Sequence, residues 1–227
     1  MTNLRILPWR NRLLSLCPFV SRLSELRHLY HSSRVWRKDG WGAPVPYFVR
    51  RAMLLTEARA IGAETFIETG TFLGDTTWSF RQQFLRSLTI EVEPPLAELA
   101  RRRFQNHPTI TVREGDSAAL LPGICAEIDG PCLFYLDGHY SGGVTGMGDK
   151  ECPIIEELTA IFSKTNGLFR IVIDDARLFG THPAYPTIGR IEAFLAEQAK
   201  PTQVRFENDA IIISQAVTLT NAINSQS

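Results

Sequence analysis

The sequence lacks the features by which a chain enters a membrane or binds nucleic acid generally. No apolar run approaches the roughly 20 residues that span a bilayer. The 24 lysines and arginines are balanced by 24 acidic residues, so the net positive charge with which nucleic-acid binders meet phosphates is missing. With 227 residues and 44% hydrophobic content, the chain is long enough to bury one core. We therefore expect a soluble, cytoplasmic protein with no transmembrane segment and no nucleic-acid partner.

Cysteine is scarce and poorly spaced for binding a metal. The four cysteines form no C-x-x-C pair and have no histidine cluster beside them; they are Cys17, Cys125, Cys132 and Cys152. Because a structural zinc site needs such spacing, we expect reduced thiols that are buried or incidental.

Residues 1–45 are nearly devoid of acidic side chains. Only Glu25 and Asp39 accompany eight basic residues there, and no small-residue cleavage site follows the short apolar stretch, which argues against a secretory signal. We predict a basic helical extension over this range. It is either a solvated helix that caps the domain, which we favour, or a segment that contacts an anionic membrane surface or an acidic partner.

The remainder contains no internal repeat and no low-complexity tract. Short apolar runs alternate with helical patterns, which is typical of βαβ units and a mostly parallel sheet. The last two strands differ, because Asn208-Asp209 joins them as a two-residue hairpin signal. We predict a doubly wound α/β domain over 46–215, whose mostly parallel, seven-stranded sheet ends in a C-terminal antiparallel hairpin, and a flexible tail over 216–227. Strands are expected over 65–68, 88–92, 109–113, 132–136, 169–173, 203–207 and 210–214, and helices over 46–62, 75–86, 95–104, 153–162 and 187–195.

The chain also lacks G-x-G-x-x-G, the fingerprint of dinucleotide-binding domains. The first strand ends instead in a segment from Glu68 to Gly74 with glycines at 70 and 74. Gly70 allows a tight turn or a close approach to a ligand, and Gly74 lets the next helix begin close to the sheet. Glu68 would repel a pyrophosphate but attract a sulfonium or amino group. The alternative for this segment is a plain strand-to-helix turn with no ligand. For the function, a nicotinamide-dependent dehydrogenase is a further alternative, against which the missing fingerprint and Glu68 count.

Acidic residues also follow the second and third predicted strands. In an open α/β sheet, ligands bind beyond the carboxyl ends of the strands. Glu91 can accept hydrogen bonds from two ribose hydroxyls, and Glu93 is either a second contact or solvated. Asp116 either accepts from an adenine amino group or caps the next helix.

Three aspartates follow the fourth and fifth strands. Because neighbouring strands lie roughly 4.8 Å apart, Asp137 can converge with Asp174 and Asp175. Converging carboxylates repel one another unless a cation lies among them, and an oxygen-only ligand set suits Mg²⁺ or Mn²⁺ better than zinc. The alternative is that one aspartate caps a helix while another pairs with Arg177 or Lys150.

His139 lies two residues after Asp137. Its imidazole can titrate near neutral pH and suits a base that removes a proton from a hydroxyl, although a lone histidine can equally be structural or solvated. The glycine-rich run over 141–148 is either a substrate lid or a loose connector.

Taken in order, these segments resemble the class I S-adenosylmethionine (SAM)-dependent methyltransferases. The matching segments are 66–71, 90–93, 114–117, 134–140 and 171–175. The resemblance implies a Rossmann-like methyltransferase fold and a set of SAM-binding residues, namely Glu68, Gly70, Thr71, Gly74, Glu91, Asp116, Ser117 and Asp137. The first four would surround the methionine part of SAM, Glu91 would hold the ribose, and Asp116 with Ser117 would hold the adenine.

The segments that contain Asp137 and Asp174-Asp175 are similar to metal-dependent sugar O-methyltransferases and to methyltransferase-like proteins of glycan pathways. That similarity implies methyl transfer to a sugar or another small hydroxylated acceptor. His139 and Asp137 would be catalytic, and Asp137, Asp174 and Asp175 would hold Mg²⁺ or Mn²⁺. The alternatives are metal-free transfer to a nitrogen or carboxylate, and an inactive methyltransferase-like module for binding or scaffolding. A homo-oligomer is compatible with each of them.

Overall fold

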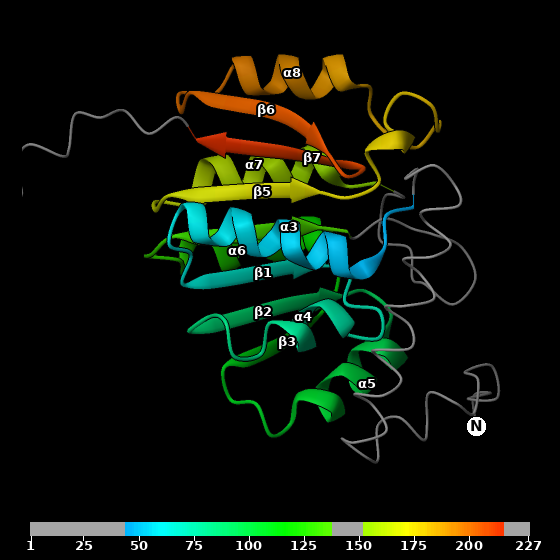
Figure 1. Cartoon of the computed structure of the whole chain (residues 1–227), viewed down its shortest axis with the longest axis vertical. Helices are drawn as coiled ribbons and strands as arrows, with labels where there is room; N and C mark the ends of the chain where they lie inside the picture. Colours follow the sequence, from blue (N-terminus) through cyan, green and yellow to red (C-terminus); the bar gives the residue numbers. More distant parts are fainter. Residues whose placement is uncertain (1–43, 138–151, 216–227) are drawn as a thin grey trace, which may run out of the picture. The chain divides into compact units, whose positions relative to one another are not determined.

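A seven-stranded sheet forms the centre of the structure, a computed structural model that describes residues 44–137 and 152–215 (Figure 1). The strands lie in the order β3-β2-β1-β4-β5-β7-β6. The first five pair in parallel, whereas β7 runs antiparallel to both β5 and β6. The predicted fold class is confirmed, including the hairpin that ends the sheet.

The chain divides into two compact units, Met1–Arg50 and Arg51–Ser227, and the sheet belongs to the second. The strands are β1 (Thr65–Thr69), β2 (Arg86–Glu91), β3 (Ile110–Glu114), β4 (Cys132–Leu136), β5 (Phe169–Ile173), β6 (Thr202–Glu207) and β7 (Ala210–Gln215). The helices are α3 (Tyr47–Ala60), α4 (Asp75–Ser79), α5 (Pro94–Phe104), α6 (Ser117–Ala126), α7 (Ile154–Lys164) and α8 (Ile188–Ala196), with the 3-10 helix η2 (Ala176–Leu178). The predicted tail and nearly all of the predicted N-terminal extension lie outside the described residues.

Two helices depart from the sequence prediction. The helix expected over 75–86 is the much shorter α4, because Phe80 and Phe84 turn inward and pack on Phe66, with ring centroids 5.1 and 5.3 Å from it. The segment that became α6 carries Pro122 in its interior, which breaks the pattern by which a helix is recognised.

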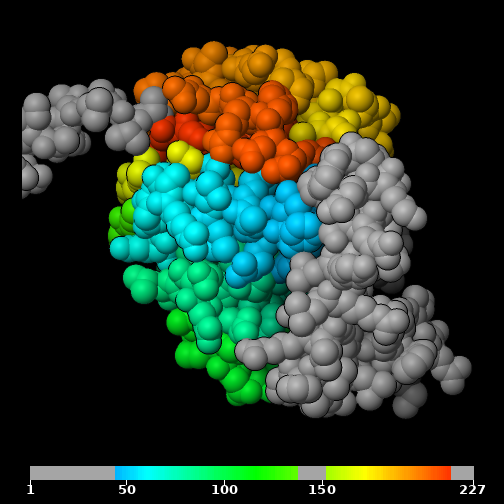
Figure 2. Space-filling view, in the orientation of Figure 1, coloured from blue at the N-terminus to red at the C-terminus, as the bar shows by residue number. Residues whose placement is uncertain are grey.

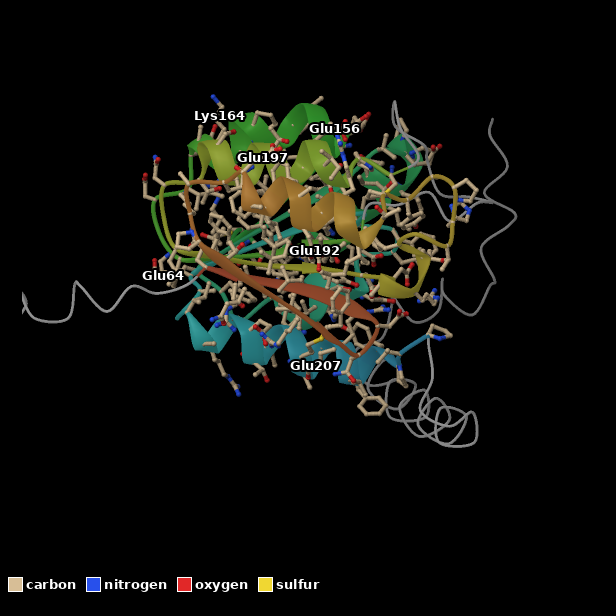
Figure 3. The ribbon with its side chains drawn as sticks, turned by 90° about the horizontal axis from the view of Figure 1, so that it is seen from above. Glu64, Glu156, Lys164, Glu192, Glu197 and Glu207 are labelled. Carbon is tan, nitrogen blue, oxygen red and sulfur yellow. The ribbon has the colours of Figure 1, made fainter. Side chains whose placement is uncertain are left out.

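Helices cover both faces of the sheet, with α3 on one side and α7 and α8 on the other (Figure 3). On the first face, α3 packs on Phe66 and Tyr135. On the opposite face, α6, α7 and α8 bury Ile67, Phe134 and Ile171. Burial of both faces leaves the strand ends as the edge at which polar side chains can meet a ligand.

A buried ion-pair network links the C-terminal part of α3 to the last strands. Glu57 is 1% exposed and pairs through one oxygen with Arg170 of β5 and through the other with Arg205 of β6. In the space-filling view, α3 adjoins the residues of β6 on this face (Figure 2). A buried carboxylate is tolerated when both oxygens are paired, so the network fixes the antiparallel hairpin against the helix layer.

Within the described part of the chain, no helix combines the length and the apolar character needed to cross a bilayer. Cys125, Cys132 and Cys152 are buried, and burial raises the pKa of the Cys125 thiol to about 11. Such thiols contribute packing rather than reactivity. Cys17 lies outside the described residues.

Candidate functional site

The carboxyl ends of the central strands meet at one edge of the sheet. The last residue of β1, Thr69, is in register with Ile90 of β2 and with Leu136 of β4. The ladder continues beyond the strands, since the backbone N–H of Asp137 donates to the Thr69 carbonyl and that of Asp174 donates to the Leu136 carbonyl, each at 3.1 Å. Four predicted site segments therefore follow strands that end side by side, as the sequence led us to expect.

The loop between β1 and α4 is built around its two glycines. Gly70 and Gly74 have φ angles of +81° and +77°, which only glycine adopts without strain. A Cβ at Gly74 would stand 2.7 Å from Cζ of Phe104, so α5 packs directly on this position. Phe72, between them, also has a positive φ of 47° and is 42% exposed. A bulky side chain in that conformation is unusual and marks a loop held in place by its surroundings.

Glu68 holds that loop from within. It is 2% exposed, and its Oε2 accepts hydrogen bonds from Thr77 at 2.6 Å and from Thr89 at 2.8 Å. The Thr89 hydroxyl is in turn 2.6 Å from that of Thr71. Burial raises the pKa of Glu68 to about 7, against the hydrogen bonds, which lower it. The structure thus places the Glu68 and Thr71 side chains in a buried polar network, and their contact with SAM stays a prediction.

Glu91 ties the same loop to β2. The carboxylate is 4% exposed, with Oε2 accepting from the backbone N–H of Phe72 at 2.7 Å and Oε1 from that of Glu93 at 3.0 Å. Each carboxylate oxygen can accept a second hydrogen bond. Glu91 can therefore hold the loop and receive two ribose hydroxyls at the same time.

Asp116 is the N-cap of α6, and its Oδ1 accepts from the backbone N–H of Ala118 at 2.8 Å. The capping role left open by the sequence is therefore realised, and an adenine contact stays a prediction. Ser117, the first residue of α6, is 8% exposed. Gly115 before them donates its N–H to the Glu91 carbonyl at 2.9 Å, so the two predicted nucleoside-binding segments lie side by side.

Asp137 and Asp174 converge on a residue that the sequence did not single out. The hydroxyl of Tyr135 lies 3.0 Å from Oδ2 of Asp137 and 2.7 Å from Oδ2 of Asp174. Tyr135 is fully buried and Asp174 is 2% exposed. In the sequence, Tyr135 reads as one more core residue of an apolar strand, and only its phenol distinguishes it from Phe134.

Asp175 does not join this pair. It has a φ of +59°, and its carboxylate pairs with Arg177 at 2.8 Å, while Arg177 also binds Asp209 in the β6–β7 turn. Among the residues described, no group of three histidine, cysteine, aspartate or glutamate side chains is arranged to hold a metal. The structure thus brings Asp137 and Asp174 together and pairs Asp175 with Arg177, and a metal role for these aspartates stays a prediction. His139, Lys150 and the run over 141–148 lie outside the described residues.

Comparison with known proteins yields likeness in structure only. No family model matches the sequence, and neither does any curated protein. The O-methyltransferase TomG from Streptomyces achromogenes, solved with SAM, has a TM-score of 0.56 and 18% identity over 84% of this chain and 90% of its own. An O-methyltransferase from Bacillus cereus, solved with S-adenosylhomocysteine (SAH), has a TM-score of 0.55 and 17% identity over the same shares. The SAH-bound methyltransferase PaMTH1 from Podospora anserina has a TM-score of 0.55 and 13% identity, over 84% of this chain and 87% of its own. The chain has the Rossmann-like fold of these methyltransferases.

Proposed function

We propose, from a fold shared with SAM-dependent O-methyltransferases, that this protein transfers the methyl group of SAM to a hydroxyl of a small acceptor such as a sugar. One observation carries the proposal. Hydrogen bonds join Glu91 to Phe72 in the Gly70–Gly74 loop and to Gly115, the residue before Asp116, at the edge where ligands bind in such sheets. The carboxylates of Glu91 and Asp116 at this edge are acceptors suited to an adenosine.

Each part of SAM has a proposed partner at this edge. The loop of Gly70 and Gly74 would surround the methionine part, with its positive-φ backbone allowing close approach. Glu91 would accept from the ribose hydroxyls, and Asp116 with Ser117 would hold the adenine. Glu68 and Thr71 would act by keeping the loop in its conformation.

The reaction needs alignment more than it needs covalent help from the protein. The acceptor oxygen attacks the methyl carbon, the bond from that carbon to sulfur breaks, and the electron pair stays on sulfur, which leaves as the neutral thioether SAH. His139, which lies outside the described residues, would take the acceptor's proton, with Asp137 as the second catalytic residue. Holding oxygen, carbon and sulfur in line supplies most of the rate in such a transfer.

The proposal includes a divalent ion, held by two of the three aspartates that the sequence predicted as ligands. Oδ2 of Asp137 and Oδ2 of Asp174 both lie within hydrogen-bond distance of the Tyr135 hydroxyl, so the two carboxylates are close to a common point. Mg²⁺ is often bound by only one or two carboxylates, with water and substrate oxygens completing its shell. These two aspartates would hold Mg²⁺ or Mn²⁺, which when bound would ease ionisation of the acceptor hydroxyl. Asp175 is left out because Arg177 engages it.

The proposal is tested by calorimetric titration of the full chain with SAH. Wild type should bind it, and Glu91→Gln should bind it at least tenfold more weakly, because loss of a charge-assisted acceptor costs roughly 1.5–3 kcal/mol. Glu93→Gln is the matched control and should stay within about twofold of wild type. A turnover assay with monosaccharides and polyols should then release SAH only when an acceptor is present.

Two results would count against this function. If the wild-type chain binds neither SAM nor SAH, the protein is a methyltransferase-like module for binding or scaffolding. If it binds SAH but Glu91→Gln binds equally well, the cofactor does not lie at this edge.

A further inference from the structure

A second fully buried glutamate lies against the same edge and has no role in the scheme above. Glu157 is in the first turns of α7 and is 0% exposed. Within the described residues, neither oxygen of its carboxyl group has a hydrogen-bond partner, and the hydroxyl of Thr69 is buried without one as well. Glu156 and Lys164 mark the two ends of α7 in Figure 3, and Glu157 follows the first of them.

Two hydroxyl groups that act on Glu157 belong to segments of the proposed cofactor site. The hydroxyls of Ser117 and Thr69 both act on its carboxyl group. Thr69 is the last residue of β1, directly before Gly70, and Ser117 is the first residue of α6, directly after Asp116. One side chain on α7 is therefore influenced by hydroxyls that adjoin the proposed methionine-binding and adenine-binding segments.

Burial decides the charge state of this group. An ionised carboxylate without a partner is costly to bury, whereas the neutral acid is much less so. Burial raises the pKa of Glu157 to about 7, Ser117 and Thr69 oppose that rise, and the negative charges of Asp116 and Glu156 add to it. The largest effect is burial, so below neutral pH the group is an acid with a proton to donate.

We propose that Glu157 positions Thr69 and Ser117 for the cofactor as a neutral carboxylic acid, and that its ionisation weakens cofactor binding. The neutral form can donate to either hydroxyl and so link β1 to α6 through α7. The ionised form can only accept from these hydroxyls, and it adds a negative charge that interacts unfavourably with that of Asp116. The loss of the donor affects both cofactor segments, and the added charge affects the segment assigned to the adenine. The inference rests on the proposed function, because it concerns affinity for SAM and SAH.

Other charged groups near this point have to be separated from Glu157. Asp116 on α6 and Glu156 on α7 are the charged groups that act on it among the described residues. Glu68, on β1, contacts α4 through Thr77 and also has a pKa raised to about 7. The pH dependence of SAH binding by wild type would therefore contain the ionisation of both glutamates. Only substitution of Glu157 isolates the contribution of that residue.

The experiment is titration of the full chain with SAH between pH 6 and pH 8.5. Wild type should bind roughly tenfold to thirtyfold more weakly at the upper pH, the upper value being the change expected when only the neutral form of one group with a pKa near 7 binds. Glu157→Gln, which stays neutral and can still donate, should retain most of the pH 6 affinity at pH 8.5. Glu192→Gln, at an exposed position of α8, is the control and should keep the wild-type profile.

A second measurement compares proton uptake in wild type and in Glu157→Gln. Titrations of both at pH 7.5 in buffers of different ionisation enthalpy report the protons taken up with SAH, and wild type should take up more than the variant. Equal uptake in the two, or an equally steep profile in Glu157→Gln, would overturn the inference while leaving the proposed function intact. Failure of wild type to bind SAH even at pH 6 would instead remove the proposed function itself.

Discussion

Adjacent residues at the end of β5 show how much of the site is decided by single side chains. Asp174 is buried and accepts from Tyr135, whereas Asp175, in a left-handed conformation, pairs with Arg177. The backbone turns between them, so their carboxylates serve different parts of the molecule. The Asp174 carboxylate belongs to the proposed acceptor site. The Asp175 carboxylate pairs with Arg177 of η2, which is itself bonded to Asp209 in the β6–β7 turn.

This difference predicts unequal losses of activity from two similar substitutions. Asp174→Asn should lower kcat by roughly a hundredfold or more, in the range of losses seen when a group acting in the transition state is removed, and leave the SAH affinity within about twofold. Asp175→Asn should cost less than tenfold, because asparagine tolerates a positive φ and the position faces Arg177. Steady-state kinetics and SAH titration of both variants measure this.

A chelator serves as the control for the ion in this comparison. Treatment of wild type with EDTA should reproduce the loss seen in Asp174→Asn, and added Mg²⁺ should reverse it. Undiminished turnover in EDTA would remove the ion from the scheme, and equal losses in the two variants would contradict the separation of their roles.

At the scale of elements, the cofactor loop depends on the packing of α5 against it. Gly74→Ala should destabilise the protein by about 1–3 kcal/mol, because alanine at φ +77° is strained and its Cβ would meet the Phe104 ring at 2.7 Å. The same displacement should weaken SAH binding. Urea unfolding and SAH titration provide the two readouts.

Gly189→Ala in α8 is the matched control for this substitution. Nothing lies within 4 Å of a Cβ placed there and its φ is not positive, so alanine should leave stability unchanged or raise it by up to about 1 kcal/mol. If Gly74→Ala were as stable as Gly189→Ala and bound SAH normally, the loop would not need its glycine.

The elements themselves could largely be predicted from the sequence, whereas their side-chain partners could not. Strand periodicity and the Asn208-Asp209 turn depend on local residues, and the seven strands formed as expected. The helix over 75–86 was wrong because Phe80 and Phe84 pack on a strand, a tertiary effect. The partner of Asp175 was left open for the same reason, since Arg177 and Asp209 meet only after the hairpin folds.

For the whole molecule, two buried glutamates, one on β1 and one on α7, lower the free energy of unfolding. Glu68 is bonded to Thr77 of α4, and Glu157 of α7 lies at Thr69 and Ser117. Burial raises the pKa of each from 4.5 to about 7. A protein that keeps two such groups beside its proposed cofactor site gives up folding free energy there.

The direction of this cost with pH can be worked out from the two pKa values. In the unfolded chain these glutamates ionise near 4.5, and in the folded chain near 7. Between those values folding takes up protons, so stability should fall as pH rises from about 4.5 to 7 and level off above. At about 1.4 kcal/mol per pKa unit, each group accounts for roughly 3 kcal/mol at the plateau.

Urea unfolding at pH 5 and pH 8 measures this for wild type and for Glu157→Gln. The variant should be close to wild type at pH 5, where the buried acid is neutral like glutamine, and more stable than wild type at pH 8, because glutamine does not have to be buried as an anion. Glu192→Gln, at an exposed position of α8, should show no such pH-dependent gain. If Glu157→Gln gained no more stability at pH 8 than at pH 5, its carboxyl group would ionise in the folded chain as it does in the unfolded one, and burial would not govern its charge.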